Sequence, residues 1–566
     1  MVKFKGRNLS ESKNRDNLIV FLVGAFLGMI IFIAIYGVSV LNPCYDDWIF
    51  NKNGDIVQHY IGWQYFRKSD WHFPLGLIDG LSDDGAFSCV YTDSIPIFAI
   101  FFKIFSPILP STFQYIGLWE FFSFILQGGI SSIIIFKLSK NKIYSLICSL
   151  FYILSPVLLI RSLRHEALSG QWVILISILS LVCINKEWKH KFTPVLIWIL
   201  NGMLAAMVHI YFIPMVYLFL LGYVIADIMK NKKIIRPVLS FVLTTAFTFL
   251  IMYAEGCFYG KGTSKDKGLG VFSANYNAFF DGQGCSKFMK LTCFAGQQEG
   301  FGYLGLGIII LAVISVIIIF AYFEHMAKSK RDIKKFLKDR LYIIIPFILM
   351  FSIGFFVAAS PKGTLNRGII YEINYPQSIM NLLSIFRASG RFVWIPFYLV
   401  YTFVFWTVSK ISKINMKNTM IFTVVFCFLI QGVDLSFWIR RTRGIFAEKK
   451  PYVSVLDNNK FNKMAENKEK IVFLNVPKNY LSYSQPYYLL TEYAFKNDMT
   501  VSSFARARNN YDSIKKYSEK EYDLLKNGKG NDKYIYFFFD EKDIPDNINL
   551  KIYKDEENKI FTAVLD

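Results

Sequence analysis

The short segment GDIVQHYIGWQYFRKSDWHFPLG, which begins at Gly54, crowds several reactive residue types together. Asp55 supplies a carboxylate, His59 an imidazole and Arg67 a guanidinium, with Gln58 and Trp63 between them. A carboxylate within hydrogen-bond reach of a hydroxyl acts as a general base when a neighbouring group sets its charge. We therefore interpret Asp55 as a catalytic base and the other four as substrate-binding residues.

Asp46 and Asp47 compete with Asp55 for the role of base. Carboxylates grouped in this way either hold a cation or remove a proton from a hydroxyl. Asp55 also follows Gly54 and precedes an apolar-periodic run, so capping of a helix is an alternative that does not exclude catalysis. The chain has no CxxC or Cys/His spacing typical of zinc, so we expect no dedicated metal site and leave a divalent cation optional.

Two further loops carry polar residues. The segment SLRHEALSGQW offers Arg164, His165 and Glu166 as substrate-binding candidates, although an ion pair explains Arg164 and Glu166 equally well. The Gly-rich stretch 275–307 contributes Glu299 and lacks the spacing of a nucleotide-binding loop. Its polar residues suit ligands rich in hydroxyl groups.

Arg387 and Arg391 lie four residues apart in SIFRASGRFVW, directly before an apolar run. If this segment is helical, both guanidiniums lie on one face at the level of lipid headgroups, where they can hold a phosphate bidentately. Snorkelling of the two side chains to the membrane interface is the alternative.

Long apolar runs must position these loops. Hydrophobic residues make up 54% of the chain, and the runs reach the roughly 20 residues that cross about 30 Å of hydrocarbon. We predict an α-helical polytopic membrane protein, with residues 1–435 forming the transmembrane domain. The eleven predicted spans are 18–41, 115–138, 142–160, 171–185, 192–212, 213–230, 236–256, 303–323, 341–359, 392–410 and 418–435.

The basic residues predict the orientation. With the N-terminus in the cytoplasm, the short loops rich in Lys and Arg all lie inside, as the positive-inside rule requires. The first external loop is then 42–114, and the other candidate residues also face outside. Within that loop, 93–110 is apolar but contains three prolines and Lys103, so we expect an interfacial or re-entrant helix there.

The net charge of +21 does not indicate a nucleic-acid partner. The basic residues are spread over many loops rather than gathered on one face, which favours contact with anionic membrane lipids. Of the eight cysteines, Cys44 with Cys89 and Cys285 with Cys293 are the candidate external pairs for disulfides, which leaves Cys257 as the odd external cysteine.

Residues 436–566 have the composition of a soluble domain. Short apolar runs at 470–476, 533–539 and 558–566 predict strands, and 478–496 and 510–526 predict helices. We expect an extracytoplasmic α/β domain that covers the outer face of the bundle.

The motifs GDIVQHYIGWQYFR, YTDSIPIFAIFFKIFSP, HEALSGQW, NAFFDGQG, EGFGYLGLG and FRASGRF, in this order over residues 18–435, together resemble the GT-C superfamily of polyprenyl-phosphate-sugar-dependent glycosyltransferases. The resemblance implies a membrane enzyme without a required cofactor. It implies that an acid of the first external loop, closest in position to Asp55, deprotonates an acceptor hydroxyl of a glycan, lipid or protein. It also implies inversion at the anomeric carbon, with Arg387, Arg391 and Arg164 neutralising the departing lipid phosphate.

Two other classes remain open on the sequence. A transporter or flippase for a lipid-linked glycan would place paired ionisable residues at mid-bilayer and show internal repeats, and neither signal is convincing. A scaffold without enzymatic activity would leave the grouped Asp and Arg residues unexplained.

Overall fold

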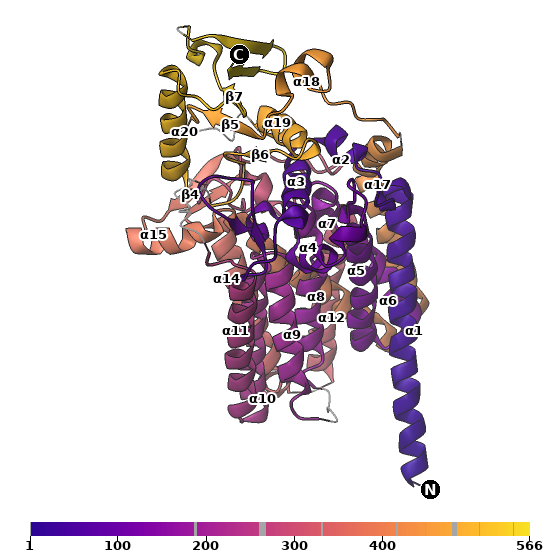
Figure 1. Cartoon of the computed structure of the whole chain (residues 1–566). Helices are drawn as coiled ribbons and strands as arrows, with labels where there is room; N and C mark the ends of the chain where they lie inside the picture. The colour runs from indigo at the N-terminus through magenta and orange to yellow at the C-terminus, as the bar shows by residue number, and fades with distance from the viewer. Residues whose placement is uncertain are drawn as a thin grey trace.

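The computed structural model describes residues 2–185, 190–259, 268–329, 332–414, 417–447, 449–477, 484–508, 510–546 and 548–565. Long helices run side by side through most of the molecule, and a smaller α/β part lies across one end of them (Figure 1). The fold is therefore mostly helical, as predicted.

Helices occupy all eleven predicted spans. They are α1 (Val2–Tyr36), α5 (Ile116–Ser139), α6 (Lys142–Ile153) with α7 (Pro156–Arg161), α8 (Trp172–Val182), α9 (Thr193–Val208), α10 (Phe212–Asn231), α11 (Ile235–Ala254), α12 (Leu306–Lys328), α14 (Leu341–Ala359), α16 (Trp394–Val408) and α17 (Lys417–Ala447). Among the described residues, nine helical segments are long and apolar enough to cross a membrane, whereas α8 and α9 are shorter.

The region between α1 and α5 folds into short elements on the end of the bundle. In order they are η1 (Ser39–Leu41), α2 (Asp47–Lys52), α3 (Asp55–Lys68), the antiparallel pair β1 (Leu77–Ile78) and β2 (Phe87–Ser88), η2 (Cys89–Thr92), α4 (Pro96–Lys103) and η3 (Ser106–Ile108). Helix α4 has only eight residues, which confirms that 93–110 is no full span. Its exposed Phe101 and the nearby Ile104 and Ile108 suit an apolar environment.

The remaining loops carry short elements as well. These are η4 (Glu166–Ser169), η5 (Gln297–Gly300), α13 (Ile333–Lys338), the hairpin β3 (Lys362–Leu365) and β4 (Gly368–Glu372), α15 (Gln377–Leu383), η6 (Ser384–Phe386), η7 (Ser389–Val393) and η8 (Ser409–Ile414). The segment around Arg387 is thus two 3-10 turns rather than one α-helix, so the condition for placing Arg387 and Arg391 on one helical face is not met.

The C-terminal part contains a five-stranded sheet in the order β6-β5-β7-β9-β8. Its elements are α18 (Asn459–Ala465), β5 (Lys470–Leu474), α19 (Ser484–Lys496), β6 (Thr500–Val501), α20 (Tyr511–Lys526), β7 (Tyr534–Phe538), η10 (Glu541–Asp543), β8 (Leu550–Asp555) and β9 (Ile560–Leu565). The three predicted strands and the helix at 510–526 are confirmed. The predicted start of the other helix, 478–483, lies outside the described residues.

Backbone hydrogen bonds join this sheet to the first loop. The Val501 amide donates to the Gly80 carbonyl at 2.9 Å, and the Asp83 amide donates to the Ser502 carbonyl at 3.0 Å, so the loop continues the edge of β6. The buried Arg506 pairs with Asp84 at 2.5 Å. Helix α19 lies beside α3, as expected of a domain that covers this end of the bundle (Figure 1).

All eight cysteines are free thiols, so both expected disulfides are wrong. Cys44 is exposed, whereas Cys89 is buried at the start of η2. Cys285 is likewise buried, whereas Cys293 is only half-buried. Proximity in the sequence therefore does not bring either pair of sulfur atoms together.

Candidate active site

Three of the six histidines of the chain gather around one carboxylate. The Nε2 atoms of His59 and His165 lie 3.9 and 3.7 Å from Asp93 Oδ2, and His209 Nε2 lies 3.3 Å from Asp93 Oδ1. We call these four residues the histidine cluster. The three imidazoles are nearly inaccessible to solvent, so the cluster is a buried polar site at the end of an apolar bundle.

Helix α3 brings His59 to Asp93 through a close backbone approach. A Cβ atom at Gly62 would lie 2.3 Å from Thr92 Oγ1, so only glycine lets α3 pack this tightly against the turn that carries Asp93. Ser94 then donates a hydrogen bond to the His59 carbonyl at 3.1 Å. Asp93 itself adopts a left-handed conformation with φ of 52°, which Asp tolerates better than most residues.

A second glycine brings together the loops that carry the other two histidines. A Cβ atom at Gly170 would lie 2.6 Å from a methyl group of Val208, directly before His209. His165 immediately precedes η4, on the loop between α7 and α8. Four separate stretches of the chain thus meet at the cluster: His59 comes from the second turn of α3, and the other three residues adjoin the end of a helix or turn.

The hydrogen bonds assign the tautomers of two imidazoles. His59 Nδ1 is bonded to the buried carboxylate of Glu166, to which it donates. His209 Nδ1 accepts the amide proton of Tyr211 at 3.1 Å, so its Nε2 carries the proton that faces Asp93. His165 has no hydrogen bond at either ring nitrogen.

The charges of the cluster are strongly coupled. Burial alone would raise the pKa of Asp93, but the His209, His165 and His59 rings hold it well below its usual range. Burial opposes the charging of His59, but Glu166, Asp93 and Asp55 raise its pKa to about 9. Burial and the nearby Arg391 lower the pKa of His165 and of His209. Asp93 is therefore an anion fixed between polar rings.

Asp55 lies at the rim of the cluster, as the first residue of α3. Its Oδ2 is 3.7 Å from His165 Nδ1, and its side chain remains 65% exposed. The surrounding protein displaces bulk water and raises the pKa of Asp55, and the carboxylates of Asp93 and Glu166 add to the rise while His59 opposes it. The carboxylate is thus accessible and more basic than an ordinary Asp.

The other two candidate bases lie apart from the histidines. Asp46 accepts a hydrogen bond from the Tyr60 hydroxyl at 2.8 Å, and Asp47 begins α2. Neither lies within ion-pair distance of a described histidine. Of the three predicted bases, the structure brings only Asp55 to the cluster.

Two arginines share one carboxylate close to the cluster. Arg161 Nη2 and Arg391 Nε lie 3.1 and 2.7 Å from Glu299 Oε2, and all three side chains are largely buried. The Arg391 guanidinium also lies 4.6 Å from the ring centre of Tyr211. We call Arg161, Arg391 and Glu299 the arginine group. Burial would raise the pKa of Glu299, but the two guanidiniums hold it well below its usual range.

Several predicted binding residues have structural roles instead. Trp63 is 1% exposed and donates to the Phe113 carbonyl at 2.9 Å, so a sugar cannot stack on it. Arg67 donates to backbone carbonyls of the loop after α4, including Pro110 at 2.7 Å, and so anchors α3 to that loop. Gln58 accepts a long hydrogen bond of 3.5 Å from Tyr488 of α19.

The remaining predicted residues divide in the same way. Glu166 is fully buried and bonds to His59 rather than to its sequence neighbour Arg164, which is exposed. Arg387 is half-buried between η6 and η7. Sequence reasoning missed Asp93, Arg161 and the role of His209. The chain has only six histidines, and His209 is one of those outside the basic loops. That scarcity was the signal that could have linked His209 to the site.

Residues 25–436 match the family profile described as Domain of unknown function (DUF6311). The chain belongs to the DUF6311 family. A second profile, the DUF6311 C-terminal domain, matches residues 460–556. No curated protein matches the chain. The histidine cluster and the arginine group lie wholly within the matched DUF6311 region.

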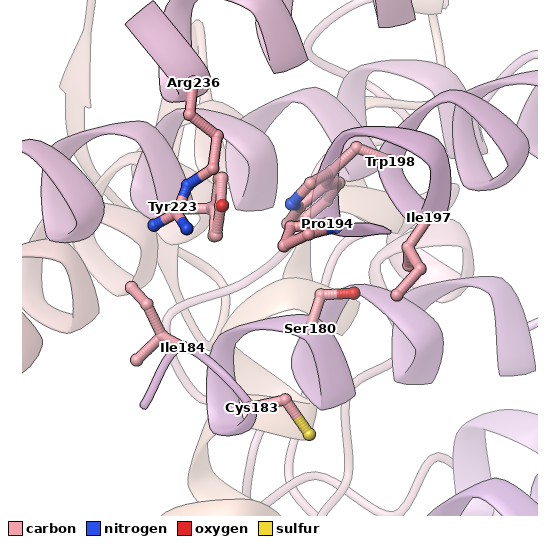
Figure 2. A pocket seen from close by; sticks show the side chains of 8 residues that line it. All are labelled: Ser180, Cys183, Ile184, Pro194, Ile197, Trp198, Tyr223 and Arg236. Atoms are coloured by element: carbon pink, nitrogen blue, oxygen red, sulfur yellow. The ribbon is translucent and has the colours of Figure 1, made fainter. Parts of the chain in front are cut away.

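A small pocket elsewhere in the DUF6311 region is a poorer candidate site. It is lined by residues of α8 to α11, as Figure 2 shows: Ser180, Cys183, Ile184, Pro194, Ile197, Trp198, Tyr223 and Arg236. It lies near the last residues of α8 and the first of α9, whereas the histidine cluster adjoins the opposite ends of both helices. Its Arg236 already pairs with Asp227.

Proposed function

We propose that this DUF6311 protein is a membrane glycosyltransferase that moves a sugar from a polyprenyl-phosphate donor to an acceptor hydroxyl. The observation that carries the proposal is the exposed Asp55 carboxylate beside a buried histidine cluster, at the end of an apolar helix bundle. The end of the bundle suits a donor whose lipid tail lies in the bilayer and an acceptor that comes from water to the exposed Asp55. The positive-inside rule supports a cytoplasmic N-terminus and an extracytoplasmic C-terminal domain.

Asp55 suits the role of base better than Asp93 does. A general base must reach the acceptor and must have a pKa high enough to take its proton. Asp55 is accessible and its pKa is raised, whereas the pKa of Asp93 is lowered by three imidazoles. Asp55 therefore deprotonates the acceptor hydroxyl of a glycan, lipid or protein, which attacks the anomeric carbon with inversion.

The arginines supply positive charge for the leaving group. Two guanidiniums face the single carboxylate of Glu299, so the arginine group keeps a net positive charge. Two further arginines lie nearby in the sequence. The exposed Arg164 comes three residues after Arg161, and the half-buried Arg387 comes four residues before Arg391. A phosphate that departs beside these cations is stabilised as its charge develops.

Buried acids in the bundle favour an enzyme over a transporter or flippase. Glu120 is near the start of α5 and accepts the Leu163 amide at 3.0 Å. Asp227 is close to the end of α10 and pairs with Arg236. Asp434 accepts the Leu306 amide at the start of α12, at 3.2 Å. These acids bind groups at helix ends, whereas a transport pathway is expected to place ionisable groups at mid-bilayer.

The test is a transfer assay with the purified full-length protein. Radiolabelled polyprenyl-phosphate sugars are incubated with candidate acceptors, and thin-layer chromatography follows the label from lipid to acceptor. The proposal requires label on the acceptor. Movement of labelled lipid between vesicle leaflets with no new glycosidic product would identify a flippase instead.

A further inference from the structure

We propose that His59, Asp93 and His165 bind a divalent transition-metal ion, and that this ion is Zn²⁺. One ligand atom from each residue can be chosen so that all three lie within 4.8 Å of one another. Asp93 Oδ2 is 3.7 Å from His165 Nε2 and 3.9 Å from His59 Nε2. Tetrahedral ligands at 2.0–2.1 Å from zinc lie about 3.3 Å apart. Each histidine must therefore move by a few tenths of an ångström relative to Asp93, and the two histidines must approach each other by no more than about 1.5 Å, to close the site.

The two proposed nitrogen ligands have no other use. His59 Nε2 and both ring nitrogens of His165 are buried and have no hydrogen-bond partner among the described residues. Leaving a buried polar atom unsatisfied costs about 1–3 kcal/mol. A metal ion between the two Nε2 atoms and Asp93 removes this cost.

Each proposed ligand also has a partner that orients it. His59 Nδ1 bonds to Glu166, and His165 Nδ1 faces Asp55 Oδ2 at 3.7 Å. His209 Nε2 carries its proton toward Asp93 Oδ1 at 3.3 Å, so His209 positions the carboxylate and is not a ligand. Imidazoles that bind metal commonly donate their other N–H to a carboxylate, as His59 does to Glu166.

The donor set selects the metal. Two imidazole nitrogens and one carboxylate oxygen suit Zn²⁺ and leave a fourth position open, as in catalytic zinc sites. Mg²⁺ prefers oxygen ligands, and Mn²⁺ or Fe²⁺ can share this set. The site stands on its own geometry. Only its role, holding a substrate oxygen next to Asp55, rests on the proposed function.

The test measures metal rather than activity. Full-length protein purified in detergent is stripped with a chelator, reloaded with Zn²⁺ and analysed by mass spectrometry, and Co²⁺ loading is followed by visible absorption. We expect about one tightly held ion per chain, as in structural and catalytic zinc sites. His165→Ala should lose the ion, and Glu166→Gln should weaken binding about 10- to 100-fold.

A matched control tests whether any histidine beside an acid gives the same signal. His72 Nε2 lies 2.5 Å from Asp79 in an exposed pair, and His72→Ala should keep the ion. Glu166→Gln preserves shape, so it decides the matter if His165→Ala does not fold. Failure of the wild-type protein to bind Zn²⁺, or wild-type affinity in Glu166→Gln and His165→Ala, would overturn the inference. Binding of Mn²⁺ without Zn²⁺ would overturn the choice of zinc.

The outcomes also separate this inference from the proposed function. Full transfer activity in protein that binds no metal would remove the metal site and leave the glycosyltransferase standing. Stoichiometric Zn²⁺ that is lost in His165→Ala, with no transfer to any acceptor, would do the reverse.

Discussion

The histidine cluster and the arginine group lie close together but differ in how their polar atoms are satisfied. In the arginine group, Glu299 lies within 3.1 Å of both guanidiniums, and burial has been compensated by opposite charge. In the histidine cluster, His165 has two ring nitrogens without a hydrogen bond and His59 has one. A buried polar group without a partner is costly, and a bound water or ion is one explanation for it.

This difference assigns different work to the two regions. Both guanidiniums of the arginine group are paired with Glu299, although Arg161 Nε has no hydrogen bond among the described residues. The group therefore holds the loops before α16 and before α8 in place and lends its net charge to a ligand. The histidine cluster is incomplete, and its rim residue Asp55 is exposed. We therefore expect the histidine cluster to carry the reaction and the arginine group to stabilise the surrounding loops. Mutations at the histidine cluster should lower turnover, whereas mutation of Glu299 in the arginine group should first lower thermal stability.

The largest effect is expected for Asp55→Asn. The amide keeps nearly the same shape, and Gly54 rather than Asp55 is the N-cap residue of α3, so folding should survive. General base catalysis contributes about 10²- to 10⁴-fold, so turnover should fall by that factor in the transfer assay while donor affinity stays the same. Asp46→Asn and Asp47→Asn are matched controls in the same loop. Loss of transfer in Asp47→Asn but not in Asp55→Asn would move the base out of the cluster.

Glu299→Gln should act on stability first. It leaves Arg161 and Arg391 buried without their carboxylate, and breaking a buried pair costs about 3–5 kcal/mol. Thermal unfolding in detergent should show a clear drop in melting temperature relative to the wild type. An unchanged melting temperature combined with loss of turnover would place Glu299 in the chemistry and erase the contrast between the two regions.

Arg391→Ala should weaken binding of the lipid-phosphate donor about ten- to a hundredfold, the value of one charge-assisted contact of about 1.5–3 kcal/mol. Arg391→Lys should recover only part of the loss because lysine lacks the planar fork of donors. Titration with a non-hydrolysable polyprenyl phosphate measures both. Wild-type affinity in the two variants would restrict Arg391 to holding Glu299.

The smallest effect is expected for His72→Ala. His72 and Asp79 form an exposed pair, and exposed ion pairs contribute about 0–1 kcal/mol. Transfer and melting temperature should both match the wild type. A loss of turnover comparable to that of Asp55→Asn would show that histidine removal near the loop disturbs the site without specificity.

Much of the helical fold follows from the length of the apolar runs. A membrane span is recognised from the length and composition of one continuous stretch of sequence, which is why the eleven predicted spans coincide with helices. The short strands β6 and β8 were missed because their pairing depends on β5 and β9, which are distant in sequence or follow a turn. Local patterns do not encode such partners.

The candidate site was predictable in part. Asp55, His59, His165 and Glu166 stood out because polar residues crowd into short loops, and the structure brings all four together. Asp93 was overlooked because it is the first residue of the apolar segment 93–110, which was interpreted only as an interfacial or re-entrant helix. Arg67 and Trp63 looked like binding residues, but their partners are backbone carbonyls some 40–50 residues away, which no spacing rule reveals.

The most direct test of the whole account is the fate of a polyprenyl-phosphate sugar incubated with purified wild-type protein and an acceptor. Chromatography of the lipid fraction and nuclear magnetic resonance of the acceptor product follow both halves of the reaction. The account predicts release of free polyprenyl phosphate in step with attachment of the sugar, with the anomeric configuration inverted, and loss of both in Asp55→Asn. Retention of configuration, or an Asp55→Asn variant as active as the wild type, would contradict it.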